Sequence, residues 1–186
     1  MKSQKNIFLE KSVLGQKTKL NNPEEVICKC IRLAYSDMLT AGRYYISNDM
    51  DTRCFKIYSL LKENNYTFSR KLIDKICPIF GDKEKIGSGN KYATRYGLSQ
   101  KVLNMTYKYL YVFSDYTNKE IDFSDCDCPL DSVILKKLKL TNYVWSKLTE
   151  SEYEICQNII ADKIKNQSLD NELMQIGNLA FDFLNW

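Results

Sequence analysis

The sequence predicts an all-α protein, and three observations support this class. Proline and glycine are scarce, at 3 and 7 of 186 residues, fewer than a fold with many tight turns would need. Long stretches without either residue carry apolar side chains three or four positions apart, which is the period of an amphipathic helix. The length suits one domain with a sizeable core. We therefore expect a single-domain multi-helix bundle over residues 1–186, with residues 1–20 as a weakly structured basic arm or a short first helix.

The first half of the sequence predicts three helices. The first begins at Pro23, because proline is favoured in the first helical turn and two glutamates follow near the positive end of the helix dipole. Its apolar residues recur at helical spacing to about residue 40. A turn or short extended piece is expected over residues 43–49. The same helical period then predicts helices over residues 50–64 and 67–80.

The second half begins with the clearest loop, residues 81–95, which contain three glycines. Apolar residues at helical spacing predict a helix over residues 96–113. After a polar loop, an aspartate that follows a proline opens a helix over residues 131–140. A Thr-x-x-Glu capping box opens the next helix, over residues 149–166. The last predicted helix covers residues 168–186.

The cysteines and the hydropathy bear on the cellular compartment. No stretch approaches 18 uncharged apolar residues, so we expect no membrane-spanning helix and no membrane partner. The N-terminal residues lack the apolar core of a signal peptide. These features predict a cytoplasmic protein, in which the 7 cysteines are reduced thiols. The oligomeric state is not predicted by any pattern in the sequence.

The absence of histidine limits the chemistry. It excludes Ser-His-Asp and Cys-His catalysis and most catalytic zinc sites. Two Cys-x-Cys pairs occur, but zinc sites usually have two to four residues between their ligands. We therefore expect neither a metal nor a cofactor. The cysteines of the two pairs are Cys28, Cys30, Cys126 and Cys128, and an alternative site for a hard cation would use Asp125, Asp127 and Asp131.

The charges are unevenly distributed, although the net charge is only +4. Lysine and arginine predominate between residues 83 and 108, whereas residues 115–131 are acidic. A basic section of this kind predicts a local patch that binds an anion. The alternative is an ordinary solvated face.

Two neighbouring segments, YGLSQKVLNMTYKYL and CPLDSVILKKL, resemble the helix-hairpin-helix DNA glycosylase/lyase superfamily. In that family a hairpin of the form Pro-Gly-hydrophobic-Gly-x-Lys enters a helix, and a hydrophobic residue followed by Asp and Ser or Thr begins a later one. Gly97 matches the first glycine, Ser99 stands at the second and Gln100 at the variable position. Lys101 and Asp131 match the catalytic lysine and aspartate.

The resemblance covers roughly residues 95–140, about a quarter of the chain. The long segment between the lysine and the aspartate is similar to the archaeal oxidised-guanine glycosylase branch. Two positions depart from the pattern, because Tyr96 replaces the usual proline and Ser99 the usual second glycine. The cysteines do not form the iron–sulfur pattern that some members carry near their C-terminus.

The resemblance implies a DNA-binding enzyme of base excision. Lys101 would attack the anomeric carbon of a flipped nucleotide and form a Schiff base, and Asp131 would stabilise the developing positive charge or deprotonate the nucleophile. The alternative is a non-enzymatic helical module that binds nucleic acid or protein, of a regulatory or phage-defence type. In the enzyme the lysine amine and the aspartate carboxylate should face one concave pocket, and in the module they should diverge or both lie in open solvent. The residues expected to contact DNA are Gly97, Ser99, Gln100, Lys91, Arg95 and Lys108.

Overall fold

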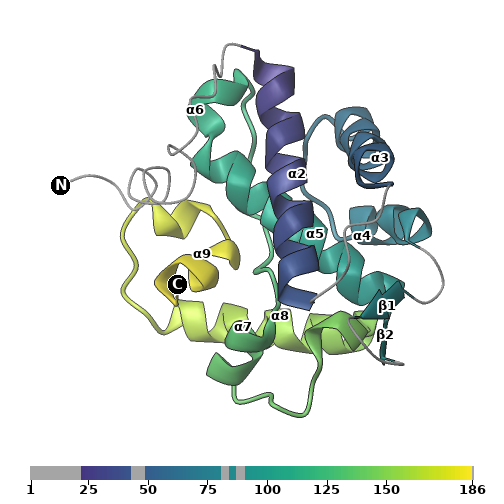
Figure 1. The fold of residues 1–186 in the computed structure, drawn as a ribbon. Helices are drawn as coiled ribbons and strands as arrows, with labels where there is room; N and C mark the ends of the chain where they lie inside the picture. The colour runs from purple at the N-terminus through teal and green to yellow at the C-terminus, as the bar shows by residue number, and fades with distance from the viewer. Residues whose placement is uncertain (1–21, 43–48, 81–83, 87–90, 186) are drawn as a thin grey trace.

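Helix α5, Arg95–Val112, passes through the middle of the molecule, and the other helices are arranged around it (Figure 1). The computed structural model describes residues 22–42, 49–80, 84–86 and 91–185. The segment predicted as a basic arm, residues 1–20, lies outside these residues, as does all but the last residue of the turn predicted over residues 43–49.

The all-α class is confirmed. Within the described residues the strands are limited to one short antiparallel pair, and no helix there combines the length and the apolar character needed to cross a bilayer. Besides α5, the described elements in chain order are α2 (Pro23–Gly42), α3 (Met50–Glu63), α4 (Lys71–Ile76), the 3-10 helix η1 (Cys77–Ile79), β1 (Glu84–Ile86), β2 (Lys91–Ala93), α6 (Ser114–Thr117), α7 (Ser132–Lys137), η2 (Trp145–Lys147), α8 (Glu150–Lys165), η3 (Leu173–Gln175) and α9 (Leu179–Leu184).

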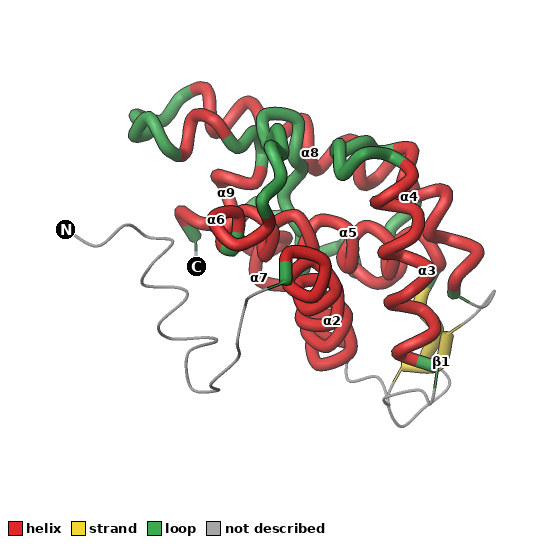
Figure 2. The backbone as a smooth tube through the Cα atoms, turned by 90° about the horizontal axis from the view of Figure 1, so that it is seen from above, coloured by secondary structure: helices red, strands yellow, loops and turns green. Residues whose placement is uncertain are grey.

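The central position of α5 decides where its polar residues lie. Every residue from Gly97 to Leu110 is buried. Helix α2 packs along α5, and α4, η1 and η2 also contact it. Seen from above, α3 and α4 lie on one side of α2 and α9 on the other (Figure 2). Because α5 is enclosed in this way, the polar side chains of its middle turns are inside the protein and need partners there.

The helix predicted over residues 96–113 is confirmed as α5, and the hairpin that the resemblance implies at Gly97–Gln100 is absent, because these residues are helical. Thr94 caps the helix: the Thr94 hydroxyl accepts a hydrogen bond from the Gly97 amide at 3.0 Å. Glycine is required at position 97 by packing, because a Cβ there would lie 2.7 Å from the carbonyl oxygen of Trp145. Lys101 consequently lies in the second turn of α5, whereas the resemblance implies a lysine where the hairpin enters the helix.

Three other predicted elements differ from the structure. The helix predicted over residues 67–80 is shortened to α4 and η1, and the loop predicted over residues 81–95 contains β1 and β2. The helix predicted over residues 168–186 is broken into η3 and α9, because Gly177 between them has a φ of +54°. A Cβ at Gly177 would also lie 2.3 Å from the carbonyl oxygen of Ser124, so the break depends on glycine.

The three most regular helical patterns are confirmed. They correspond to α2, α3 and α8, with small shifts at the ends. The predicted capping box at the start of α8 is present: the Thr149 amide donates to the Glu152 carboxylate at 2.9 Å, and the Glu152 amide donates to the Thr149 hydroxyl at 3.4 Å. Buried side chains from the helices and the connecting segments form one continuous apolar core.

Candidate active site around Lys101 and Asp131

Lys101 and Asp131 form a direct ion pair. The Lys101 Nζ donates to Oδ2 of Asp131 at 2.9 Å, and the two side chains are 4% and 25% exposed. Asp131 is also the N-cap of α7, where its Oδ1 accepts hydrogen bonds from the amides of Val133 and Ile134, both at 2.9 Å. Each carboxylate oxygen therefore has its own donors, and the carboxylate is fixed in position.

The surroundings of Asp131 favour its charged form. Burial alone would raise the pKa of this carboxyl, but the positive charge of Lys101 and the hydrogen bonds to Asp131 outweigh the burial. The pKa of Asp131 is therefore below its ordinary value. A carboxylate with a lowered pKa stabilises the folded state above its ordinary pKa, and this contribution is lost as the pH falls through the lowered value.

Replacing Asp131 by asparagine should change how stability depends on pH. The variant keeps an oxygen that can cap α7 but has no charge to lose in acid. We expect its unfolding free energy to lie below that of the wild type at pH 7, and the difference to shrink as the pH falls below about 4. Urea unfolding at a series of pH values measures this, with Asp74→Asn on the exposed face of α4 as the control. Parallel curves for wild type and Asp131→Asn would contradict it.

The structure does not bring the residues predicted to contact DNA to one surface. Gly97, Ser99, Gln100 and Lys108 are buried within α5, because the helix is enclosed by its neighbours. Their prediction as DNA contacts is therefore not supported by their positions. Arg95 lies half-buried in the first turn of α5, and Lys91 lies on β2.

The buried polar residues of α5 hold an irregular segment, residues 126–130, which is itself buried. The Gln100 side-chain amide donates to the carbonyl of Leu130 at 3.1 Å and accepts from its N–H at 3.3 Å. From α8, the Gln157 amide does the same for Cys128, at 2.7 and 3.1 Å. These two side chains satisfy backbone groups that a buried loop would otherwise leave unpaired. They also fix the segment that leads directly to Asp131.

A second buried ion pair lies two turns along α5 from the first. Lys108 pairs with Asp182 of α9, and these side chains are only 3% and 7% exposed. The Lys108 Nζ also lies 5.4 Å from the centre of the Phe183 ring. The buried thiol of Cys128 is affected by the charges of both ion pairs, and burial raises the pKa of that thiol well above its ordinary value. The thiol is therefore not poised as a nucleophile.

A third charged contact fixes the acidic residue of the buried segment. Arg70 donates to the two carboxylate oxygens of Asp127 at 2.6 and 2.9 Å, and the Tyr153 hydroxyl donates to the same carboxylate at 2.9 Å. Tyr153 in turn accepts from the Asn104 amide at 2.8 Å. Asp127 is thus committed to internal partners, although the sequence marks it as one of three residues that could hold a hard cation. In the part of the chain that the structure describes, no three acidic, cysteine or histidine side chains gather as a metal site would require.

Sequence reasoning missed the partners that α8 and α9 supply. Tyr153 and Gln157 lie one turn apart among the buried residues of α8, together with Cys156 and Ile160. Polar side chains on the apolar face of an amphipathic helix were the available signal. No comparable local signal marks Asp182 as the partner of Lys108, because the pairing depends on how α9 docks.

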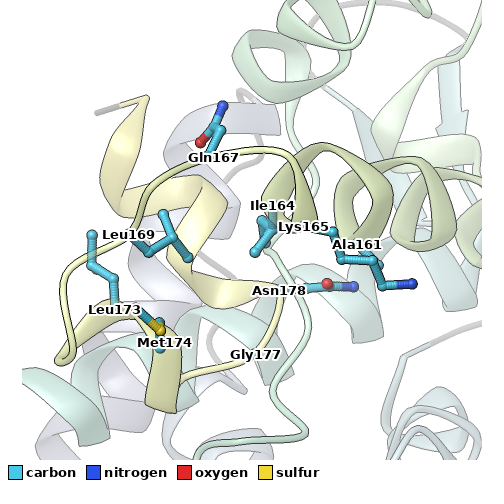
Figure 3. Close-up of a pocket in the computed structure, with 9 residues that line it drawn as sticks. All are labelled: Ala161, Ile164, Lys165, Gln167, Leu169, Leu173, Met174, Gly177 and Asn178. Atoms are coloured by element: carbon cyan, nitrogen blue, oxygen red, sulfur yellow. The ribbon is translucent and has the colours of Figure 1, made fainter.

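The structure also contains a groove of about 430 Å³, away from the Lys101–Asp131 pair. It lies between the C-terminal part of α8, η3 and the segment before α9, and its lining includes Ile164, Leu169 and Leu173 (Figure 3). Ile164 and Leu169 face each other across it, while the side-chain amide of Gln167 points away. None of the residues predicted as functional lines this groove.

No protein-family model, no curated protein and no solved structure matches the chain. The lysine of the candidate site lies on α5 and the aspartate, 30 residues later, is the N-cap of α7, and their direct contact is the main chemical feature of the site.

Proposed function

We propose that the protein is a DNA base-excision enzyme, a glycosylase with abasic-site lyase activity that uses Lys101 as its nucleophile. The observation that carries the proposal is the contact of Lys101 with Asp131, 30 residues away, at 2.9 Å. The aspartate caps the helix that follows, which is the arrangement that the resemblance implies for the catalytic pair. An amine held beside a fixed carboxylate suits a reaction in which positive charge develops on a sugar.

The chemistry assigns a separate task to each residue. The unprotonated Lys101 amine would attack the anomeric carbon of an extruded nucleotide, forming a C–N bond while the glycosidic bond breaks and the base leaves with a proton. The sugar ring would then open, because the nitrogen lone pair forms the C=N bond while the C1′–O4′ bond breaks and O4′ takes up a proton, and this gives the protonated Schiff base. The Asp131 carboxylate would stabilise the positive charge on the sugar ring during the first step.

Access to the amine is the main structural requirement of this proposal. The Lys101 side chain is 4% exposed, whereas that of Asp131 is 25% exposed. A substrate would therefore approach from the side of Asp131, where Ser132 and Val133 at the start of α7 are exposed. Lys101 would have to exchange its contact with Asp131 for a contact with the sugar.

A non-enzymatic binding module is the second candidate, and the same burial favours it. In that case Lys101 serves only to neutralise the buried side of Asp131, and the pair anchors the start of α7 to α5. Four of the six residues predicted to contact DNA are buried, which agrees with a structural role for the polar residues of α5. The two candidates differ in whether the lysine forms a covalent bond with DNA.

Borohydride trapping on DNA with abasic or oxidised-guanine sites tests the proposal. We expect a covalent adduct with the wild type, its loss in Lys101→Gln, and its retention in Lys163→Gln, a control on the exposed side of α8. Peptide mapping of the wild-type adduct should place the modification on Lys101, which keeps the test decisive if Lys101→Gln folds poorly.

The other outcomes separate the two candidates. Salt-sensitive DNA binding without an adduct would reject the enzyme and leave the binding module. An adduct on another lysine would reject the assignment of Lys101. If neither an adduct nor DNA binding is observed, the Lys101–Asp131 pair is only a helix cap with an internal counter-ion.

A further inference from the structure

Residues 132–149 form the most uniformly basic described segment of the protein. They contain four lysines and no aspartate or glutamate. All four lysines are exposed. We call this set the α7–η2 surface, and it consists of Lys136, Lys137, Lys139 and Lys147.

The carboxylates that flank this segment are largely committed elsewhere. Asp131 is paired with Lys101 and with two amides of α7. Glu152 is turned back to Thr149 in the capping box of α8. Glu150 is exposed and remains at the edge of the surface. Two of the three carboxylates next to this segment in the sequence are therefore occupied by other groups, and the segment itself adds only positive charge.

The surface continues into the β1–β2 pair. The amide of Thr94, which follows β2, donates to the carbonyl of Ser146 in η2 at 2.7 Å, and η2 contacts β2. Lys91 lies on β2 and Lys85 on β1. In Figure 1, α7, the loop after it and the β1–β2 pair follow one another along the lower edge of the molecule. A polyanion lying along this edge would thus pass α7, the loop after it and η2, which together carry the four exposed lysines.

Two exposed apolar residues lie among the lysines. Val133 is 55% exposed and Val144 51% exposed, and Tyr143 beside Val144 is partly exposed. A nucleic acid presents sugar faces between its phosphates, so it fits a surface on which small apolar and cationic groups alternate. Val133 is also two residues from Asp131, which joins this surface to the candidate active site.

We propose that the α7–η2 surface binds the phosphate backbone of a nucleic acid and positions it beside Asp131. This inference rests on the proposed function, and it replaces the buried α5 residues as the source of phosphate contacts. Binding through flexible lysines carries little sequence information, because phosphates are the same at every base pair. The surface would therefore hold the substrate, while the lesion is selected at the active site.

The test changes all four lysines of the α7–η2 surface to glutamine. A matched control changes four exposed lysines on other parts of the molecule, and these are Lys71, Lys75, Lys163 and Lys165. Both variants lose the same charge, so a general electrostatic effect changes both equally. Fluorescence anisotropy with duplex DNA, single-stranded DNA and duplex RNA, between about 50 and 200 mM salt, gives the affinity and its salt dependence.

We expect the surface variant to lose about 3 to 4 from the slope of log K against log salt, because each phosphate contact contributes about 0.9. The control should keep a slope within about 1 of the wild type. The three probes show whether the bound backbone is that of DNA or RNA. Equal losses in the two variants, or an unchanged slope in the surface variant, would overturn the inference.

Two further outcomes separate this inference from the proposed function. A Lys101-dependent adduct that forms with an unchanged slope in the surface variant would leave the enzyme in place and reject only this surface. Binding of vesicles rich in anionic lipid through the four lysines, without binding of any nucleic acid, would assign the surface to a membrane and overturn the inference.

Discussion

Asp182→Asn is expected to lower the unfolding free energy by about 3–5 kcal/mol, the usual cost of removing one member of a buried ion pair. Asp182 and Lys108 are 7% and 3% exposed, so the Lys108 ammonium cannot turn to water when the charge of its partner is lost. The ring of Phe183 remains near the Lys108 Nζ but offers a much weaker contact than a carboxylate. Chemical denaturation of the variant against the wild type measures the effect.

Two control variants separate the loss of a buried charge from the loss of any carboxylate. Asp162→Asn removes a carboxylate 3.7 Å from the Lys165 amine at the surface, where both side chains are more than 70% exposed, and we expect a change within about 0.5 kcal/mol. The double variant Lys108→Met with Asp182→Leu removes both charges and should recover most of the loss. A loss in Asp182→Asn no larger than that of the surface control would show that the Lys108 ammonium reaches water.

The two ion pairs of α5 differ in a way that bears on function. The Lys108–Asp182 pair is closed to solvent on both sides, whereas the Lys101–Asp131 pair is partly open at the aspartate. A purely structural pair gains nothing from this opening. A nucleophile needs it, because the substrate must reach the amine. The asymmetry therefore favours Lys101 over Lys108 as the reactive lysine of the proposed enzyme.

The sequence predicts those parts of the fold that depend on local pattern. The helices α2, α3 and α8 follow from apolar residues at helical spacing, from Pro23, and from the capping box of Thr149 and Glu152. The break before α9 was missed because Gly177 is a single residue whose φ is set by close packing against Ser124. The predicted hairpin failed for a similar reason, since Gly97 is explained by contact with η2 and not by a turn.

The candidate site, like the fold, could be predicted only where it depends on local sequence pattern. The contact of Lys101 with Asp131 agrees with the resemblance, in which the lysine follows a hairpin that enters a helix and the aspartate begins a later helix. The burial of Gln100 and Lys108 could not be predicted, because the pattern of α5 gives one apolar face while the fold encloses the whole helix. Their partners come from segments whose docking no local pattern encodes.

Arg70→Met is expected to lower the unfolding free energy by about 1–3 kcal/mol, because it leaves the buried Asp127 carboxylate without its cation, while the 42% exposure of the Arg70 side chain keeps the loss below that of a fully buried pair. The Asp127 side chain is 3% exposed and receives two of its short hydrogen bonds from Arg70. After the change it keeps the Tyr153 hydroxyl at 2.9 Å and a long contact from the Asn178 amide at 3.5 Å. Denaturant unfolding measures the loss, and the neighbouring exposed change Lys71→Met should stay within about 0.5 kcal/mol of wild type.

The same variant links the buried segment to the proposed reaction. Asp127 lies four residues before Asp131, in a segment held by Gln100 and Gln157, so freeing it should loosen the position of the Asp131 carboxylate. If the protein is the proposed enzyme, Arg70→Met should form the borohydride adduct more slowly at a temperature where it is still folded, and Lys71→Met should form it at the wild-type rate. A stability loss with an unchanged trapping rate would mean that Asp131 is fixed by its cap on α7 alone. A negligible stability loss would show that Asp127 is solvated and that the contact with Arg70 adds little.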